Sequence, residues 1–186
     1  MHYSEVSAMS QKNGAVVWFV GLSGSGKSTI GRIVERRLQQ NGIPHAVLDG
    51  DELRQTLSPD LGFSYEDRIQ HIRRTMLVAR LLSRNGIVVL APLITPYREM
   101  REECRRTLPA YKEVYVKCPL EHCIARDVKG LYAKAIAGRI SQFTGISDRF
   151  DEPDNPSLVV ETDKETPEIS ADKVIRLLRE SGVRLP

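Results

Sequence analysis

The sequence predicts an α/β protein in which helices cover both faces of a five-stranded, mainly parallel β-sheet. Two observations lead to this prediction. Short apolar runs alternate along the chain with segments of helical periodicity, the pattern of strand–helix–strand units with parallel strands. The run IVVL at 87–90 is apolar without alternation, as expected of a strand that is covered on both faces. A three-layer architecture follows.

The chain of 186 residues is long enough for one domain with a hydrophobic core, and 41% of its residues are hydrophobic. We expect strands at 15–20, 45–48, 87–91, 113–117 and 158–161. We expect helices at 27–41, 51–57, 64–85, 96–107, 119–127 and 168–181. Helix 64–85 has the clearest pattern. Its apolar residues are spaced by three and four, and Ser64 with Asp67 forms a capping pair at its start.

Two segments have no regular pattern. Residues 1–13 contain no hydrophobic region of the signal-peptide kind, and we expect a disordered tail there, with the folded domain at 14–186. Residues 128–157 mix glycine and proline with charged and aromatic residues. An irregular segment of this length is often a lid that closes over a substrate.

Bulk properties argue against several kinds of partner. The formal net charge of +3 is too small to indicate a nucleic acid. Apolar runs are all shorter than a membrane span, so we expect no membrane association. The 3 cysteines are odd in number and lack the spacing of a metal site, which favours reduced thiols and a cytoplasmic location.

The stretch GLSGSGKST at 21–29 fits the phosphate-binding pattern G-x-x-x-x-G-K-[ST], and it lies between an expected strand and an expected helix. A flexible linker is the alternative, but that strand–loop–helix context argues against it. Lys27 is expected to reach the β- and γ-phosphates of ATP, and the Ser28 hydroxyl to ligate Mg²⁺. The expected ATP-binding residues here are Gly21, Leu22, Ser23, Gly24, Ser25, Gly26, Lys27, Ser28 and Thr29. Together with the strand pattern, this loop predicts a P-loop NTPase-type fold with a lid segment.

Two carboxylates follow the second expected strand, in LDGDELR at 48–54. Asp49 and Asp51 are therefore expected at the carboxyl end of the sheet, where ligands bind in open α/β folds. A carboxylate there can ligate Mg²⁺ through water or orient an attacking hydroxyl group. An ordinary Asp-Gly turn is the alternative, and the neighbouring phosphate loop favours the functional interpretation.

Cationic and aromatic residues form a second group of candidates. Arg68 and His71 share a helical face near Phe63, an arrangement that suits an anionic nucleotide, although arginine-rich faces are often simply solvated. Lys129 and Arg126 begin the irregular segment. Cations there can close over a triphosphate and stabilise charge during phosphoryl transfer.

Six segments together resemble adenylyl-sulfate kinases, in order and in spacing: GLSGSGKST, LDGDELR, LGFSYEDRIQHIRR, TPYREMR, RDVKGLYAKA and FTGI. The resemblance spans about residues 14–165. It implies transfer of the γ-phosphoryl group of ATP to the 3′-hydroxyl of adenylyl sulfate, which gives 3′-phosphoadenylyl sulfate, with ATP as co-substrate and Mg²⁺ as cofactor. It also implies a homodimer and suggests a functional link to an ATP sulfurylase.

The resemblance implies roles for individual residues. Asp51 matches the acidic residue near the acceptor hydroxyl and the metal, and Lys129 matches a lid lysine near the transferred group. Arg126 matches a residue that packs toward the ATP base, and Phe143 an aromatic that stacks on the acceptor adenine, although an aromatic in that loop could also fold onto the core. The expected acceptor-binding residues are Asp51, Arg54, Phe63, Arg68, His71, Arg98, Lys129, Leu131, Phe143 and Thr144.

The chain departs from the family pattern at four places. His71 stands where asparagine is common, Thr95 where serine is usual, and Arg139 where glutamate is frequent. Residues 145–153 read GISDRFDEP instead of GIDDPYEPP. Some members carry a phosphoserine at the position of Thr95, which makes Thr95 a candidate phospho-acceptor.

These departures leave two alternatives open. One is a related P-loop kinase that acts on another nucleotide-conjugate acceptor. The other is a non-catalytic nucleotide-binding module, which the presence of Lys27, Ser28, Asp51 and Lys129 makes the weaker alternative.

Overall fold

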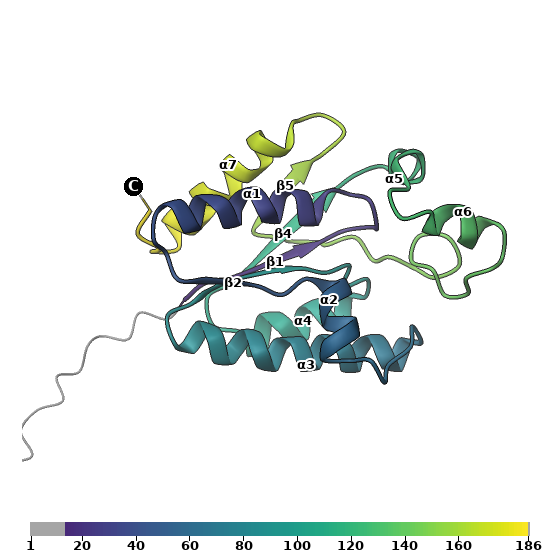
Figure 1. Cartoon of the computed structure of the whole chain (residues 1–186), viewed down its shortest axis with the longest axis horizontal. Helices are drawn as coiled ribbons and strands as arrows, with labels where there is room; N and C mark the ends of the chain where they lie inside the picture. The colour runs from purple at the N-terminus through teal and green to yellow at the C-terminus, as the bar shows by residue number, and fades with distance from the viewer. Residues whose placement is uncertain (1–13, 186) are drawn as a thin grey trace, which may run out of the picture.

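The computed structural model describes residues 14–185, so the tail expected at 1–13 lies outside the described residues. Figure 1 shows three layers, with α1 and α7 on one face of the sheet and α3 and α4 on the other. The strands are β1 Val16–Val20, β2 His45–Val47, β3 Val88–Pro92, β4 Tyr111–Lys117 and β5 Leu158–Glu161. The helices are α1 Lys27–Gln40, α2 Gly50–Thr56, α3 Tyr65–Arg84, α4 Arg98–Thr107, α5 Leu120–Arg126, α6 Leu131–Ile136 and α7 Pro167–Glu180.

The sheet confirms the predicted fold class. Its five strands run in the order β2-β3-β1-β4-β5, and every neighbouring pair is parallel. The central strand β1 lies between β3 and β4, where the strand order changes direction. Ligands of open parallel sheets bind beyond the carboxyl ends of the strands at such a switch point. The chain leaves β1 at this point through residues 21–26 and enters α1.

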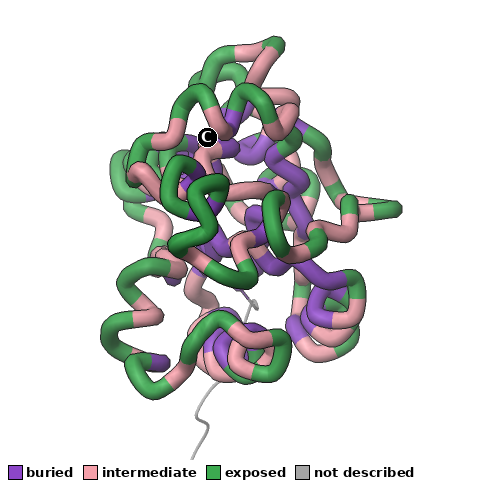
Figure 2. The backbone as a smooth tube through the Cα atoms, turned by 90° about the vertical axis from the view of Figure 1, so that its right-hand side faces the viewer, coloured by how far each residue is buried: buried purple, intermediate pink, exposed green. Residues whose placement is uncertain are grey.

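The core has two halves because β1 is buried on both faces. Val17 and Phe19 pack with residues of α1 and α7, whereas Val16, Trp18 and Val20 pack with residues of α3 and α4. All five side chains are fully buried. Figure 2 shows the same distribution, with buried segments inside and exposed turns around them. Successive strand residues point to opposite faces, so one apolar strand serves both layers.

One helix was not predicted. Residues 128–157 were expected to be irregular throughout, but they contain α6 at Leu131–Ile136. The Asp127 carboxylate accepts hydrogen bonds from the backbone N–H groups of Tyr132 and Ala133, both at 3.0 Å, and so caps the start of this helix. A helix of 6 residues is too short to display a periodic apolar pattern, and a cap stabilises its first turn instead.

The helix expected from residue 96 begins later, at Arg98. Tyr97 has an extended backbone, with φ −101° and ψ 143°, so the helix cannot start before Arg98. Thr95 has a φ of 46°, a left-handed conformation that is rare for a β-branched residue. Two residues hold Thr95 in this conformation. Trp18 Nε1 donates to Thr95 Oγ1 at 2.8 Å, and the buried Arg101 donates to the carbonyl oxygens of Thr95 and Pro96.

Within residues 14–185 the helices are all too short or too polar to cross a membrane.

Candidate active site

The phosphate loop is closely packed against the end of the sheet. A Cβ atom on Gly21 would lie 2.5 Å from the Val116 carbonyl oxygen, so a larger residue there would force the loop away from β4. Gly26, which precedes α1, has a φ of 103° and lies in the region that only glycine adopts readily. The loop therefore turns its backbone toward the space in front of α1, as an anion-binding nest requires.

Lys27 lies inside this loop. Its ammonium group donates to the carbonyl oxygens of Gly21 at 2.9 Å and Leu22 at 2.6 Å, and the residue is 8% exposed. Burial lowers the pKa of Lys27 to about 8, and smaller opposing effects on this pKa come from the charges of Lys129 and Asp51. The sequence analysis assigned Lys27, Asp51 and Lys129 to one site. In the structure they are close enough for the charges of Asp51 and Lys129 to affect the pKa of Lys27.

The shifted pKa of Lys27 predicts how nucleotide affinity depends on pH. Above about pH 8 the free protein begins to lose the Lys27 proton. Bound phosphate groups favour the charged form, so the complex keeps a proton that the free protein has lost. The dissociation constant for ADP should therefore rise with pH above about 8, by about tenfold per unit at most. Calorimetric titrations with ADP from about pH 7 to about pH 10 measure this pH dependence of the dissociation constant. A Lys27→Met control should lack the dependence, and a flat wild-type profile would contradict the argument.

Asp49, rather than Asp51, lies against the expected metal ligand Ser28. Ser28 Oγ donates to Asp49 Oδ2 at 3.2 Å, and Asp49 Oδ1 accepts from the backbone N–H of Asp51 at 2.9 Å. Asp49 is thus both the N-cap of α2 and the partner of Ser28. The metal ligands were expected to be Ser28 and Asp51. In the structure the carboxylate that contacts Ser28 is that of Asp49, and Asp51 points elsewhere.

The two oxygen atoms of Ser28 and Asp49 fit a magnesium ion that is shared with a nucleotide. Mg²⁺ prefers oxygen ligands, keeps several waters, and takes one or two protein ligands together with phosphate oxygens. Across residues 14–185 there is no cluster of three or more His, Cys, Asp or Glu side chains suited to a metal ion. Ser28 and Asp49 match the one or two protein oxygen ligands that a phosphate-shared ion takes.

Asp51 instead pairs with Lys129. The Lys129 ammonium contacts Asp51 Oδ2, with 53% and 68% of the respective side chains exposed. The pair connects α2 with the segment between α5 and α6. It brings together two residues 78 positions apart that the sequence singled out separately. A carboxylate and a cation are thus in contact beside the phosphate loop and remain open to a ligand.

Three side chains contact the phosphate loop: that of Arg126, which the sequence singled out, and those of Tyr132 and Thr162, which it did not. Tyr132 of α6 donates its hydroxyl hydrogen to the Ser23 carbonyl oxygen at 2.9 Å. Arg126 donates to the Gly24 carbonyl at 3.2 Å and to the Thr162 carbonyl at 2.7 Å, and Thr162 Oγ1 donates to the Ser25 carbonyl at 2.8 Å. Thr162 follows β5 and carries no motif, so only the fold brings it to the loop.

On the acceptor side, Phe63 provides a flat surface beside two guanidinium groups. Phe63 is 57% exposed, so its ring is accessible to a ligand. The guanidinium carbon of Arg54 lies 4.7 Å from the centre of the Phe63 ring, and that of Arg68 lies 5.6 Å from it. An aromatic face next to two cations suits a nucleobase with an anionic group attached.

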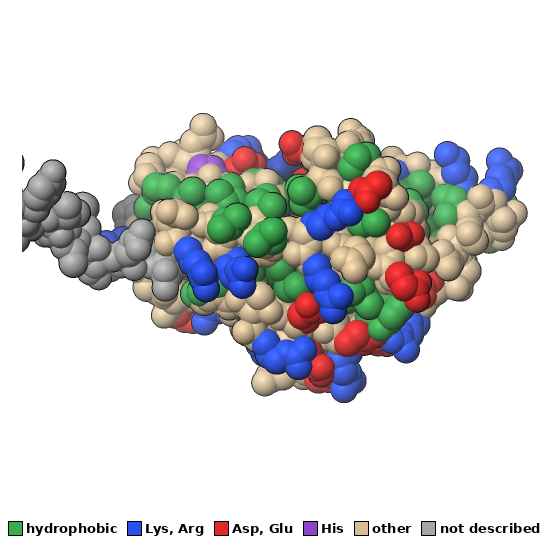
Figure 3. Space-filling view, turned by 90° about the horizontal axis from the view of Figure 1, so that it is seen from below, with side chains coloured by type: hydrophobic (Ala, Val, Ile, Leu, Met, Phe, Trp, Pro, Cys, Tyr) green, Lys and Arg blue, Asp and Glu red, His purple; other side chains and the backbone are tan. Residues whose placement is uncertain are grey.

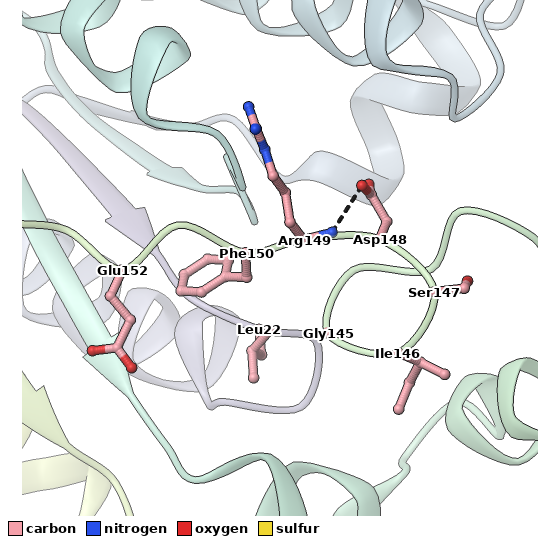
Figure 4. Close-up of a pocket in the computed structure, with 8 residues that line it drawn as sticks. All are labelled: Leu22, Gly145, Ile146, Ser147, Asp148, Arg149, Phe150 and Glu152. Atoms are coloured by element: carbon pink, nitrogen blue, oxygen red, sulfur yellow. Dashed lines mark hydrogen bonds between the residues drawn. The ribbon is translucent and has the colours of Figure 1, made fainter.

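The second aromatic of the acceptor side, Phe143, is partly buried. Its ring meets that of Tyr132 edge to face, with centroids 5.0 Å apart. The neighbouring Thr144 is 3% exposed, and its hydroxyl has no hydrogen-bond partner. Leu131 is the first residue of α6, directly before Tyr132. Beyond this loop lies an open hollow of about 610 Å³, where Phe150 faces Leu22 and the Arg149 side chain points away (Figure 4).

Three expected residues occupy different settings. His71 is 4% exposed, its Nδ1 lies 3.1 Å from Ser58 Oγ, and burial lowers its pKa to about 4, so it stays neutral and contacts protein. Arg98 is exposed and pairs with Asp154 at 3.0 Å, at the outer edge of the site. Thr95 is 2% exposed and its hydroxyl accepts from Trp18. This burial argues against Thr95 as a phospho-acceptor, because a phosphoryl donor could not reach it.

Comparison with known proteins agrees with this geometry. The family model for adenylylsulphate kinase matches residues 13–161. An adenylyl-sulfate kinase of Halothermothrix orenii is 53% identical over 179 residues, which are 96% of this chain and 97% of the relative. A probable bifunctional SAT/APS kinase of Sorangium cellulosum is 46% identical over 91% of this chain, which corresponds to 29% of that longer protein.

A solved structure is similar as well. The Mycobacterium tuberculosis APS kinase CysC, in complex with AMPPNP and APS, superimposes with a TM-score of 0.86 at 46% identity, covering 90% of this chain and 98% of that one. The family model and the full-length relative both match most of this chain, and they do so over the segments that form the site. The chain therefore belongs to the adenylylsulphate kinase family.

Proposed function

We propose that this protein transfers the γ-phosphoryl group of ATP to the 3′-hydroxyl of adenylyl sulfate. The observation that carries the proposal is the contact between Asp51 and Lys129 beside the phosphate loop. It sets a carboxylate that can accept a hydroxyl proton next to a cation that can stabilise a phosphoryl group in transfer. Membership of the family and the exposed Phe63 between two arginines support adenylyl sulfate as the acceptor.

The residues divide the reaction between them. The phosphate loop and Lys27 bind the β- and γ-phosphates, and Ser28 and Asp49 would hold the magnesium ion, which neutralises phosphate charge when bound. Asp51 orients the acceptor hydroxyl and takes its proton as the oxygen forms a bond with the γ-phosphorus. The bond to the β-phosphate oxygen breaks and ADP leaves. During the transfer, Lys129 exchanges its contact with Asp51 for a contact with the moving phosphoryl group. Catalysis of this kind is mostly positioning and charge stabilisation.

An assay with ATP, Mg²⁺ and adenylyl sulfate, coupled to ADP formation, tests the proposal. Adenosine monophosphate is the matched control, because it has the adenine and the 3′-hydroxyl but lacks the sulfate. We expect kcat/KM to be far higher for adenylyl sulfate, since charge-assisted hydrogen bonds from arginine contribute about 1.5–3 kcal/mol each. Equal efficiency on both acceptors, or none on adenylyl sulfate, would favour the kinase of another nucleotide conjugate.

Segment 128–157 is proposed to act as a lid. Its contacts with the loop through Tyr132 and with Asp51 through Lys129 support this role. Phosphoryl transfer to an alcohol requires exclusion of water, so the segment should become more ordered when both sites are filled. Hydrogen exchange should slow across 128–157 on adding ADP and adenylyl sulfate together, and less with ADP alone. The same exchange in the free and doubly liganded protein would refute the lid.

The proposed assembly is a homodimer, and the proposed location is the cytoplasm. Figure 3 looks onto the face of α3 and α4, where hydrophobic side chains gather among charged ones. Leu77 and Leu81, one turn apart on α3, are 51% and 55% exposed and offer a surface to a second copy. Light scattering measures the mass of the protein in solution and so distinguishes a monomer from a homodimer.

The 3 buried free thiols suit a reducing compartment, which supports the proposed cytoplasmic location. The bifunctional relative supports a functional link to an ATP sulfurylase.

A further inference from the structure

Residues 142–148 form a compact loop closed by its own hydrogen bonds. Its ends are joined by the hydrogen bonds Asp148 N–H to Phe143 O at 3.1 Å and Gly145 N–H to Asp148 O at 2.8 Å. The Ser147 hydroxyl oxygen accepts from the Phe143 N–H at 2.9 Å. Because these bonds are internal, they fix the shape of the loop but not its place in the protein. Its place depends on contacts with other elements.

Arg68 of α3 holds both ends of the 142–148 loop. Its Nη2 donates to the Gln142 carbonyl oxygen at 2.5 Å, and its Nε lies 3.6 Å from Asp148 Oδ2. The same Nε donates to the Phe63 carbonyl oxygen at 2.9 Å. Only 9% of the Arg68 side chain is exposed. Arg68 therefore links the two aromatic residues of the acceptor side, Phe63 directly and Phe143 through its loop.

Asp148 is the anion that faces this buried guanidinium. Asp148 Oδ2 also accepts a hydrogen bond from the Tyr97 hydroxyl at 2.6 Å, and 19% of the Asp148 side chain is exposed. Burial and the bond to Asp148 raise the pKa of Tyr97 to about 12, so the phenol stays a donor at neutral pH. Tyr97 is the N-cap residue of α4. One carboxylate thus joins the loop to α3 and to the start of α4.

We propose that Asp148 is a positioning residue for the acceptor nucleotide, because its carboxylate joins Arg68 and Tyr97 and thereby fixes the loop that carries Phe143. The proposal rests on the proposed function. The ATP side of the site does not depend on this junction, since Lys27 and Arg126 contact the phosphate loop without any contribution from the 142–148 loop. Loss of the junction should therefore weaken acceptor binding without weakening ATP binding.

The test is the Asp148→Asn variant, which keeps an acceptor for the Tyr97 hydroxyl but removes the charge that faces Arg68. We expect the KM for adenylyl sulfate to rise about tenfold, the size of one lost charge-assisted contact. Both kcat and the KM for ATP should change by less than about twofold, since the junction positions the loop that carries Phe143 and not the reacting groups. Tyr97→Phe should also raise the KM for adenylyl sulfate. The double variant should raise this KM by less than the product of the two single effects, because both substitutions break the same junction.

Glu152→Gln is the matched control, because this exposed carboxylate lies four residues further along and contacts Lys117, at 3.8 Å, and the Tyr115 hydroxyl instead of Arg68 and Tyr97. Hydrogen exchange of residues 143–148 in the ligand-free protein should quicken in Asp148→Asn and not in Glu152→Gln. Unchanged exchange, an unchanged KM for adenylyl sulfate, or an equal rise in both KM values would overturn the proposal. If the wild type does not phosphorylate adenylyl sulfate, the proposed function fails by itself, and the exchange rates still decide whether Asp148 holds the loop.

Discussion

Replacing Lys27 by alanine is expected to lower kcat by about two orders of magnitude or more. Lys27 is a fixed positive charge inside the phosphate loop, and removing one such contact from a phosphoryl-transfer site costs about 3 kcal/mol or more. Steady-state assays with saturating ATP and adenylyl sulfate measure the loss. A folded variant with wild-type turnover would refute the phosphate-loop interpretation.

Lys27→Ala also removes the two hydrogen bonds inside the loop, so a second variant is needed. Lys27→Met keeps the length of the side chain and loses only the charge and the donors. Because burial disfavours the charged form of Lys27, the methionine variant should be at least as resistant to thermal unfolding as the wild type. Lys173→Ala on α7 is the control lysine and should keep normal turnover. Low activity combined with early unfolding in both Lys27 variants would indicate a structural role instead.

The order of strands and helices was predictable because it depends on local pattern. Apolar runs gave all five strands, and the loop at 21–29 was recognisable because glycine, lysine and serine must follow one another at fixed spacing. The exception is α6, whose 6 residues are held by the Asp127 cap rather than by an apolar stripe. Short helices whose stability comes from a cap and from tertiary contacts leave little trace in periodicity.

The site was predictable only in part, because its remaining contacts join distant segments. Thr162 reaches the site through the fold, and no local motif marks it. Tyr97 and Asp148 lie in segments that the sequence analysis quoted, but their contact with each other joins residues 51 positions apart. The two carboxylates of 48–54 were recognised, but their division of roles was not. The β-region conformation of Asp49 at the start of α2 turns its side chain toward Ser28 and leaves Asp51 exposed. A spacing of two residues cannot show which of them contacts Ser28.

Asp51→Asn is expected to lower kcat by about 10²–10⁴-fold while the affinity for ADP stays within about threefold. Asparagine has nearly the shape of aspartate but cannot take a proton from the acceptor hydroxyl. The contact with Lys129 is lost as an ion pair, yet more than half of each side chain is exposed. An exposed pair stabilises a protein by less than about 1 kcal/mol, so the variant should remain folded.

Glu52→Gln is the control for this substitution. Glu52 lies next to Asp51 in the first turn of α2 and is exposed, so its loss lowers the local negative charge equally. If that charge alone mattered, both variants would slow turnover to the same degree. If Asp51 handles the acceptor proton, only Asp51→Asn will do so, and calorimetry will show that ADP binds both variants about equally. Normal turnover in Asp51→Asn would leave Asp51 as a turn residue and transfer the search for the base to Asp49, which already lies 3.2 Å from the Ser28 hydroxyl.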